Sequence, residues 1–267
     1  MCGIAGMIWT DPQRVGDAEP LEEALAAIWR RGPDGQGTLI RPGITAGMRR
    51  LAIIDLEGGQ QPIFNETGDV GVLFNGEIYN FRELRKRCEA RGHVFRTRSD
   101  TEVLVHLYED QGPDFVSLLN GMFAFVIWDG PARRALLARD RFGIKPLHIA
   151  RTHNGLAFAS EVKALAAAKW VSREINRDTL SAYMRFGWVP DQGAGPPDRR
   201  RGRASTGRGR AGGTVSQRLH RLVSAGPRGP SPSYRLPCHM VAFRERDHRF
   251  PVGIARKKNR PSGGDRC

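Results

Sequence analysis

The chain opens with MCGIAGMIW, residues 1–9, in which a cysteine follows the initiator methionine and leads into an apolar run. Residues 4–9 predict a buried first strand. Removal of a methionine that precedes a small residue would leave Cys2 with a thiol and a free α-amino group. An α-amine has a pKa near ~8, so it can accept the thiol proton without a His or Asp partner. Taken alone, a Cys here is more often a small buried residue.

The sequence up to about residue 188 alternates apolar segments with turn signals, as in a folded domain. One expected helix carries Leu21, Leu25 and Ile28 on one face. Two more are expected from an Asn80–Glu83 capping box to about Ala90 and from a Ser99–Glu102 capping box through Leu107. A short helix is expected to start at Pro113, and another to extend from a Ser160 cap through Leu165. Expected strands are 51–56, 70–74, 121–129, 134–140, and 147–150 paired with 156–159, with turns across 30–37. The strands from residue 121 onward are expected to be antiparallel neighbours. The order of the expected elements along the chain, with strands followed by helices and then by strands again, favours an α+β fold with antiparallel sheets.

The character of the chain changes after Pro190. Residues 191–267 carry 18 of the 42 Lys and Arg but only 5 of the 28 Asp and Glu, which places a net +13 of the total +14 in this segment. They also hold 12 Gly, 8 Pro and 16 Arg, without hydrophobic periodicity. Such a composition buries too little apolar area to offset the entropy of ordering, so we expect residues 189–267 to be a disordered tail.

Several classes of protein are disfavoured by the sequence. The cysteines are Cys2, Cys88, Cys238 and Cys267, without a CxxC pair or a neighbouring His at zinc-ligand spacing, so no metal site is expected. Four scattered cysteines suggest a reducing cytoplasm rather than a disulfide scaffold. No signal peptide and no apolar run near the ~20 residues needed to span a bilayer is present. No P-loop occurs, and a GxGxxG string, GRGRAG at residues 207–212, lies in the Gly- and Arg-rich segment without an apolar strand pattern before it.

Six short motifs appear in one order: MCGIAG, RRGPDGQG, NGEIYN (75–80), SDTEV (99–103), GMFAF (121–125) and RDRFGIKPL (139–147). Together they resemble the class II glutamine amidotransferase domain of asparagine synthetases, over residues 2–188. The resemblance implies a four-layer αββα N-terminal nucleophile hydrolase sandwich of two antiparallel sheets. It also implies hydrolysis of glutamine to glutamate and ammonia, without metal or cofactor, through a thioester on Cys2.

The resemblance assigns the remaining site residues. Asn75, through its side-chain amide, and Gly76, through its backbone N–H, correspond to the oxyanion hole. Arg50 corresponds to the partner of the substrate α-carboxylate, and Asp100 and Glu77 to the acceptors of its α-ammonium. Leu51 and Ile53 are expected to line the pocket through their backbones. The family commonly has His two residues before the arginine, where this chain has Met48.

Each assignment has a simpler alternative when it is taken alone. Asp100 can be a charge at a helix start, Arg50 a solvated neighbour of Arg49, and NGEIYN a turn with an N-cap. The motifs as a set favour the functional interpretation.

The resemblance also implies a destination for the ammonia. In asparagine synthetases a C-terminal domain uses ATP, and with it Mg²⁺, to activate aspartate. Its SGGxDS loop has no counterpart here beyond SGGD at residues 262–265, which has the wrong spacing. The candidate partners are therefore glutamine and either a separate synthetase polypeptide or a second copy of this chain; an amidotransferase with another acceptor is the nearest alternative.

The tail allows two further hypotheses. Arg, Gly, Pro and Ala are typical of GC-rich codons read out of frame, so a frameshift in the gene or in its assembled sequence would account for it, and sequencing the locus tests this. Arg-rich tails also bind nucleic acid, but only Tyr234, Phe243 and Phe250 supply aromatic stacking, which disfavours that function. The third alternative is a fragment without activity.

Overall fold

The computed structural model describes residues 1–56, 58–173, 177–187, 215–216 and 239–244. The strands are β1 (Gly3–Trp9), β2 (Gly35–Arg41), β3 (Ile44–Arg50), β4 (Ile63–Phe64), β5 (Val70–Ile78), β6 (Gly121–Asp129), β7 (Arg134–Arg139), β8 (His148–Thr152), β9 (Gly155–Ala159), β10 (Val215–Ser216) and β11 (His239–Arg244). The α-helices are α1 (Ala18–Ala27), α2 (Phe81–Glu89), α3 (Val103–Gln111), α4 (Val162–Ala167) and α5 (Arg177–Phe186). Two 3-10 helices are η1 (Trp29–Arg31) and η2 (Gly112–Leu118).

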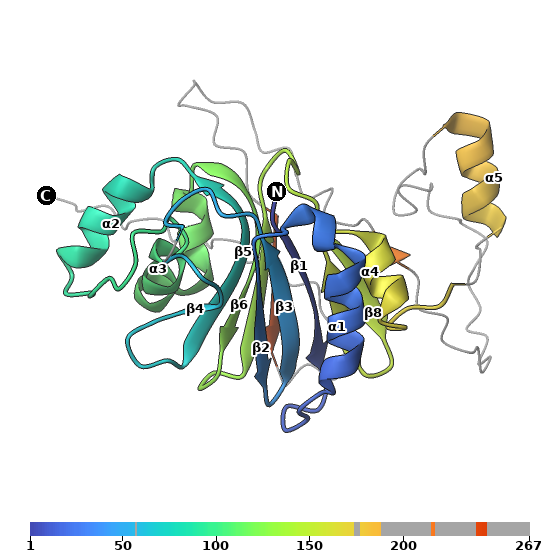
Figure 1. Ribbon diagram of the computed structural model, residues 1–267, viewed down its shortest axis with the longest axis horizontal. Coiled ribbons are helices and arrows are strands. Elements are labelled where there is room, and N and C mark those ends of the chain that lie inside the picture. The colour runs from blue at the N-terminus through green and yellow to red at the C-terminus, as the bar shows by residue number, and fades with distance from the viewer. Residues whose placement is uncertain (57, 174–176, 188–214, 217–238, 245–267) are drawn as a thin grey trace, which may run out of the picture.

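The strands form two antiparallel sheets. The first has the order β10-β8-β9-β1-β3-β2 and the second the order β11-β7-β6-β5-β4. Figure 1 shows the sheets face to face, with α1 and α4 beyond the first sheet and α2 and α3 beyond the second. None of the helices in the described part of the chain has the length and apolarity required to cross a bilayer.

Three apolar layers hold these elements together. The first packs α1 and α4 on one face of β1 and β9, and the second fills the space between the two sheets. The third packs α2 and α3 against the outer face of β5 and β6. The predicted four-layer αββα architecture is confirmed.

Strand β1 lies in the middle of the first sheet and is buried on both faces, which is why it has an apolar run rather than an alternating pattern. Ile4 and Ile8 point into the layer between the sheets, whereas Ala5 and Met7 face the helices. Gly6 shares the inward face, and a Cβ there would lie 2.6 Å from Cβ of Ala46 and 2.7 Å from the ring tip of Phe158.

The sequence predicts most of the elements and misses some. The helices at 18–27, 81–89, 103–111 and 162–167 and the strands β1, β6, β7, β8 and β9 agree with the predictions, and β5 is longer than expected. Strands β2 and β3 were not predicted, because their Gly, Thr and Arg residues interrupt the apolar pattern. The predicted run of neighbouring strands is wrong in one respect: β7 and β8 lie in different sheets.

The predicted strand at 51–56 is wrong. The segment is a loop in which the side chains of Ile53 and Leu56 are 73% and 63% exposed. Asp55 has a φ of 52°, a conformation incompatible with a strand. The backbone carbonyls of this loop instead accept hydrogen bonds from Arg50.

Asn80 occupies the N-cap position of α2, as predicted, but none of the predicted capping side chains caps its helix, because each binds elsewhere. The Asn80 side chain contacts Leu118 O and Asn120 N, and the Glu102 carboxylate accepts hydrogen bonds from Thr97 and from the N–H of Arg96. Ser160 accepts a 3.0 Å bond from the N–H of Ile4 rather than capping α4.

The predicted disorder of residues 189–267 falls mostly outside the described residues. The described residues of this segment are β10 and β11, which pair with β8 and β7 at the edges of the two sheets. The residues 239–244, HMVAFR, form an apolar run in an otherwise polar tail.

Gly6→Ala should lower the free energy of unfolding by about 1–3 kcal/mol, because the added methyl group overpacks the layer between the sheets. Chemical denaturation measures the change. The exposed Ala132→Ser is the matched control and should stay within about 0.5 kcal/mol of the parent chain. Equal stability of Gly6→Ala and the parent would contradict the packing described here.

Candidate functional site

Cys2 and Arg50 lie opposite each other at one end of the layer between the sheets. Gly3 pairs with Arg49, which sets Cys2 against Arg50 at the start of β1 and the end of β3. Side chains two residues apart on a strand share a face. Ile4 points into the layer between the sheets, as does Met48, so Cys2 and Arg50 point there too.

The facing strand β5 contributes polar residues in the same way. Leu73 belongs to the layer between the sheets, whereas Phe74 belongs to the layer beneath α2 and α3. By the same alternation, Asn75 and Glu77 face the first sheet and Ile78 faces the helices. Asn75 is buried, with 1% of its surface exposed.

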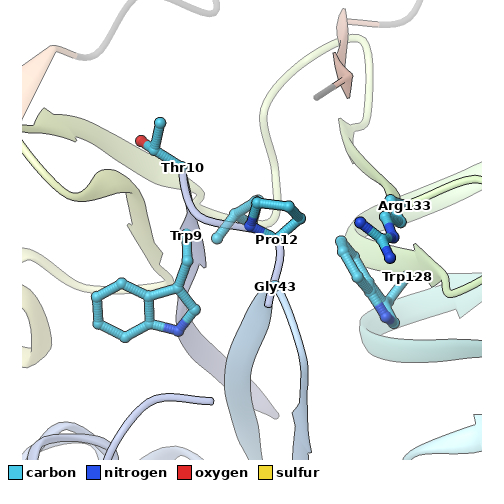
Figure 2. A pocket seen from close by; sticks show the side chains of 7 residues that line it. Trp9, Thr10, Pro12, Gly43, Trp128 and Arg133 are labelled. Atoms are coloured by element: carbon cyan, nitrogen blue, oxygen red, sulfur yellow. The ribbon is translucent and has the colours of Figure 1, made fainter. Parts of the chain in front are cut away.

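A small hollow shows which ends of the two sheets meet. It is lined by Ile8, Trp9, Thr10, Pro12, Gly43, Trp128 and Arg133, so the far end of β1 lies beside Trp128 of β6 (Figure 2). Trp128 pairs with Gly71 at the start of β5. The opposite end of β1, which carries Cys2, therefore lies at the Asn75 end of β5, and Figure 1 shows the N-terminus between β1 and β5.

The thiol of Cys2 is half-buried and contacts one residue of the following loop. The N–H of Leu51 donates to the sulfur at 3.3 Å, and the thiol faces Leu51 O at 3.6 Å. Leu51 therefore approaches the sulfur through its backbone.

The backbone of Cys2 is held by an arginine that the sequence analysis did not single out. Nε of Arg31 donates to the carbonyl of Cys2 at 2.9 Å, and its Nη1 forms a 2.9 Å ion pair with Glu161. A Cβ at Gly3 would lie 2.9 Å from Cδ of Arg31. Gly3 thus leaves the space through which Arg31 reaches Cys2.

Arg50 is 4% exposed and holds the loop that follows it. Its Nη1 donates to Leu56 O, and its Nη2 donates to Ile54 O and Asp55 O, at 2.7–3.1 Å. The simpler interpretation of Arg50 as a solvated surface residue is therefore wrong. The side chain of Ile53, in the same loop, is exposed, and no recorded contact with the described residues places it in a pocket.

Two other carboxylates fix this loop. Asp34 accepts a hydrogen bond from the N–H of Ala52, and Asp55 accepts one from the N–H of Arg98. The second contact joins the loop to the segment that precedes α3. The RRGPDGQG motif, treated as a turn from sequence, thus supplies both Arg31 and Asp34; only the spatial arrangement reveals what they hold.

The amide nitrogen of Asn75 has no hydrogen-bond partner among the described residues, although it is buried. Buried donors without partners are uncommon in proteins, since each costs about 1–3 kcal/mol. Asn75 therefore presents an unsatisfied donor to the polar end of the layer that also contains Cys2.

The N–H of Gly76 points away from β6. Phe123, its partner on β6, exchanges hydrogen bonds with Asp140 instead, so Gly76 and Phe123 form a non-hydrogen-bonded pair. On the same edge of β5, the N–H of Phe74 donates to Gln61 and that of Ile78 donates to Asp100. Gly76 lies between them, and a Cβ there would collide with the carbonyl of Met122.

Asp100 is buried beside this edge of β5. Its Oδ2 accepts the Ile78 N–H at 2.8 Å, and the side chain is 4% exposed. Burial raises the pKa of Asp100, and the nearby charge of Glu77 raises it further, although the Ile78 hydrogen bond acts in the opposite direction. A cation beside Asp100 would relieve this cost. Asp100 lies three residues before the start of α3, outside its first turn, so the interpretation of Asp100 as only a helix-start charge does not account for it.

Comparisons with known proteins identify the family of the chain. Residues 1–195 match the family model described as a glutamine amidotransferase domain. The chain belongs to this family.

Its relatives include asparagine synthetases. Asparagine synthetase [glutamine-hydrolyzing] 1 of Bacillus subtilis is 42% identical over 193 residues, which cover 72% of this chain and 30% of the relative. Asparagine synthetase [glutamine-hydrolyzing] 2 of Arabidopsis thaliana is 41% identical over 167 residues, covering 62% and 28%. The chain thus spans about 30% of the length of these curated relatives.

A solved structure supports the fold. Glutamine phosphoribosylpyrophosphate amidotransferase from B. subtilis superposes with a TM-score of 0.53 at 24% identity, covering 63% of this chain and 44% of that one. The similarity extends to the arrangement of the two sheets and their helices.

Within this amidotransferase domain, Met48 occupies the position where the resemblance predicts His. Met48 is 1% exposed, pairs with Ile4 across the sheet and packs in the layer between the sheets. Its role is therefore to fill the core beside Cys2, a position that suits a flexible apolar side chain.

The two described cysteines should react differently with an alkylating agent. Burial raises the pKa of Cys88 to about 11, with the nearby charge of Asp110 acting in the same direction, and its side chain is inaccessible. Iodoacetamide at pH 8 should therefore modify Cys2 but leave Cys88 intact, as measured by peptide mass mapping. In denaturant both should react. Equal native reactivity of Cys88 and Cys2 would contradict the burial of Cys88.

Proposed function

We propose that this amidotransferase domain, residues 2–188, hydrolyses glutamine to glutamate and ammonia with Cys2 as its nucleophile. The observation that carries the proposal is the polar end of the otherwise apolar layer between the sheets. There Cys2 points inward from one sheet, and from the other points Asn75, whose amide nitrogen has no partner among the described residues.

The reaction requires removal of Met1, which is 56% exposed and packs little of its side chain. The α-amine of Cys2 then accepts the thiol proton while the sulfur attacks the side-chain carbonyl carbon of glutamine. Collapse of the tetrahedral intermediate breaks the C–N bond, and the α-ammonium gives its proton to the departing amide nitrogen, which leaves as ammonia. Water hydrolyses the resulting thioester to glutamate and regenerates the thiol.

The oxyanion of that intermediate needs donors that are already in place. We assign this role to Nδ2 of Asn75 and the backbone N–H of Gly76. The first is buried without a partner, and the second points out of the β5–β6 ladder. A preorganised donor of this kind typically lowers a barrier by about 3–4 kcal/mol.

The α-amino acid part of glutamine carries one group of each sign. We propose that Asp100 and Glu77 accept hydrogen bonds from its α-ammonium, because Asp100 is a buried carboxyl with a raised pKa and Glu77 lies one residue from its partner Ile78. Arg50 is the proposed partner of the α-carboxylate, which would replace some of the loop carbonyls that Arg50 now binds. Leu51 and Ile53 belong to the loop that would then border the substrate.

The destination of the ammonia follows from the relatives. Because these are glutamine-hydrolysing asparagine synthetases, we propose that ammonia is used to form asparagine from aspartate and ATP, with Mg²⁺, when a synthetase domain is supplied by another polypeptide. The glutaminase step itself uses only protein groups.

A glutamine analogue bearing an electrophilic diazoketone should add once to the mature chain, at Cys2, as measured by intact-mass and peptide analysis. The parent chain should also release ammonia from glutamine. Cys2→Ala should show neither adduct nor ammonia while unfolding at the same temperature. A chain that retains Met1 and remains unmodified, or a Cys2→Ala variant that still releases ammonia, would contradict the proposal.

A further inference from the structure

A second cluster of chemically reactive side chains lies behind β5, away from Cys2. Glu66 comes from the turn between β4 and β5, His93 follows α2, and His106 and Glu109 lie one turn apart on α3. One ligand atom from each of the four lies within 4.8 Å of all the others. The turn, the loop and the helix thus converge on one point.

His106 is the member of this cluster that points most directly to a ligand. Its side chain is 1% exposed, yet neither ring nitrogen has a hydrogen-bond partner among the described residues. Nδ1 faces carboxylate oxygens of Glu66 at 3.4 Å and Glu109 at 3.6 Å. A buried imidazole without hydrogen bonds, turned toward two carboxylates, has the arrangement of a metal ligand.

The spacing of the four side chains matches a tetrahedral site. Bonds of ~2.0–2.1 Å to a zinc ion place neighbouring ligand atoms roughly 3.3–3.4 Å apart. Besides the two contacts of His106, Nδ1 of His93 lies 3.2 Å from Glu66 and 4.0 Å from Glu109. Small side-chain movements would bring all four atoms onto one ion.

The groups behind these ligands have the arrangement seen around bound metals, where the second nitrogen of a histidine faces a carboxylate. Nε2 of His93 lies 3.3 Å from Asp110, and Nε2 of His106 lies 3.8 Å from Glu102. Asn65 donates a 2.6 Å hydrogen bond to Glu109 and fixes that carboxylate. Both imidazoles could therefore present Nδ1 to the same ion.

The electrostatic environment favours positive charge at this point. Carboxylate oxygens of Glu66, Glu109 and Glu102 lie 3.4, 3.6 and 3.8 Å from the ring nitrogens of His106. A divalent cation and a pair of protonated imidazoles satisfy the same charge requirement. The two rings differ in geometry: both nitrogens of His93 lie at hydrogen-bond distance from carboxylates, whereas neither nitrogen of His106 forms a hydrogen bond among the described residues, which favours the cation at His106.

We propose that Glu66, His93, His106 and Glu109 bind one structural Zn²⁺ ion. Two imidazoles and two carboxylates suit zinc in tetrahedral coordination. Glu66 and Glu109 are 32% and 29% exposed, which gives the ion a path from solvent. The ion joins the β4–β5 turn, the loop after α2, and α3, whose preceding segment carries Asp100. It lies outside the glutaminase reaction and steadies the edge of β5 that the reaction uses.

Zinc binding to the full-length chain tests the site, measured by equilibrium dialysis with elemental analysis and by thermal unfolding in the presence and absence of Zn²⁺. The same measurements are made on His93→Gln, Glu109→Gln, and the control Glu89→Gln, whose carboxylate pairs with Arg85 on α2. Cys2→Ala is included because a thiol also binds zinc.

The parent chain, Glu89→Gln and Cys2→Ala should each bind one zinc ion in this site and unfold at a higher temperature when it is bound. His93→Gln and Glu109→Gln should bind zinc at least tenfold more weakly and lose that thermal shift, while their metal-free unfolding temperatures stay near the parent's. Equal zinc affinity and equal thermal shift in the parent and both ligand variants would overturn the proposal, as would absence of binding to the parent.

Discussion

The burial of an apolar layer between two antiparallel sheets is the constraint on which the rest of this structure depends. Each strand that contributes to the layer must present one face inward, and β1 must be apolar on both faces because helices cover its other side. The layer is apolar along most of its length and polar at one end, where β1 and β3 bring Cys2 and Arg50 opposite Asn75 and Glu77 of β5.

Glycine and arginine make this end possible. Gly3 leaves room for Arg31, whose guanidinium fixes the carbonyl of Cys2 and pairs with Glu161 near α4. Arg50 holds the loop after β3 through three backbone carbonyls. Contacts from three separate parts of the chain thus determine the position of the thiol. The local motif around Cys2 is therefore not sufficient by itself to build the site.

Local sequence patterns predicted the long apolar strands and the helices, since these depend on neighbouring residues. They failed where a long-range contact decides the outcome. Residues 51–56 are apolar enough for a strand, but the buried guanidinium of Arg50 needs their carbonyls. Asn80 and Glu102 have the spacing of helix caps, but they bind Leu118 and Thr97 instead.

For the site residues too, the sequence and the structure supply different information. The resemblance singled out Cys2, Asn75, Gly76 and Asp100, and the structure describes their surroundings: an amide nitrogen without a partner among the described residues, an N–H outside the ladder and a buried carboxyl. The histidine–glutamate cluster could not be found from sequence, because Glu66 and His93 are distant from His106 and only folding brings them together.

The central claim is that Asn75 stabilises charge in the transition state rather than supporting the fold. The most direct measurement is kcat for ammonia release from glutamine by Asn75→Ala, compared with the parent chain at saturating glutamine. Because Nδ2 of Asn75 has no partner in the part of the chain that the structure describes, the substitution removes no hydrogen bond seen at that atom, and the unfolding temperature should change little. The account predicts a decrease in kcat of roughly 100- to 1000-fold. An unchanged kcat in a folded Asn75→Ala chain would contradict it.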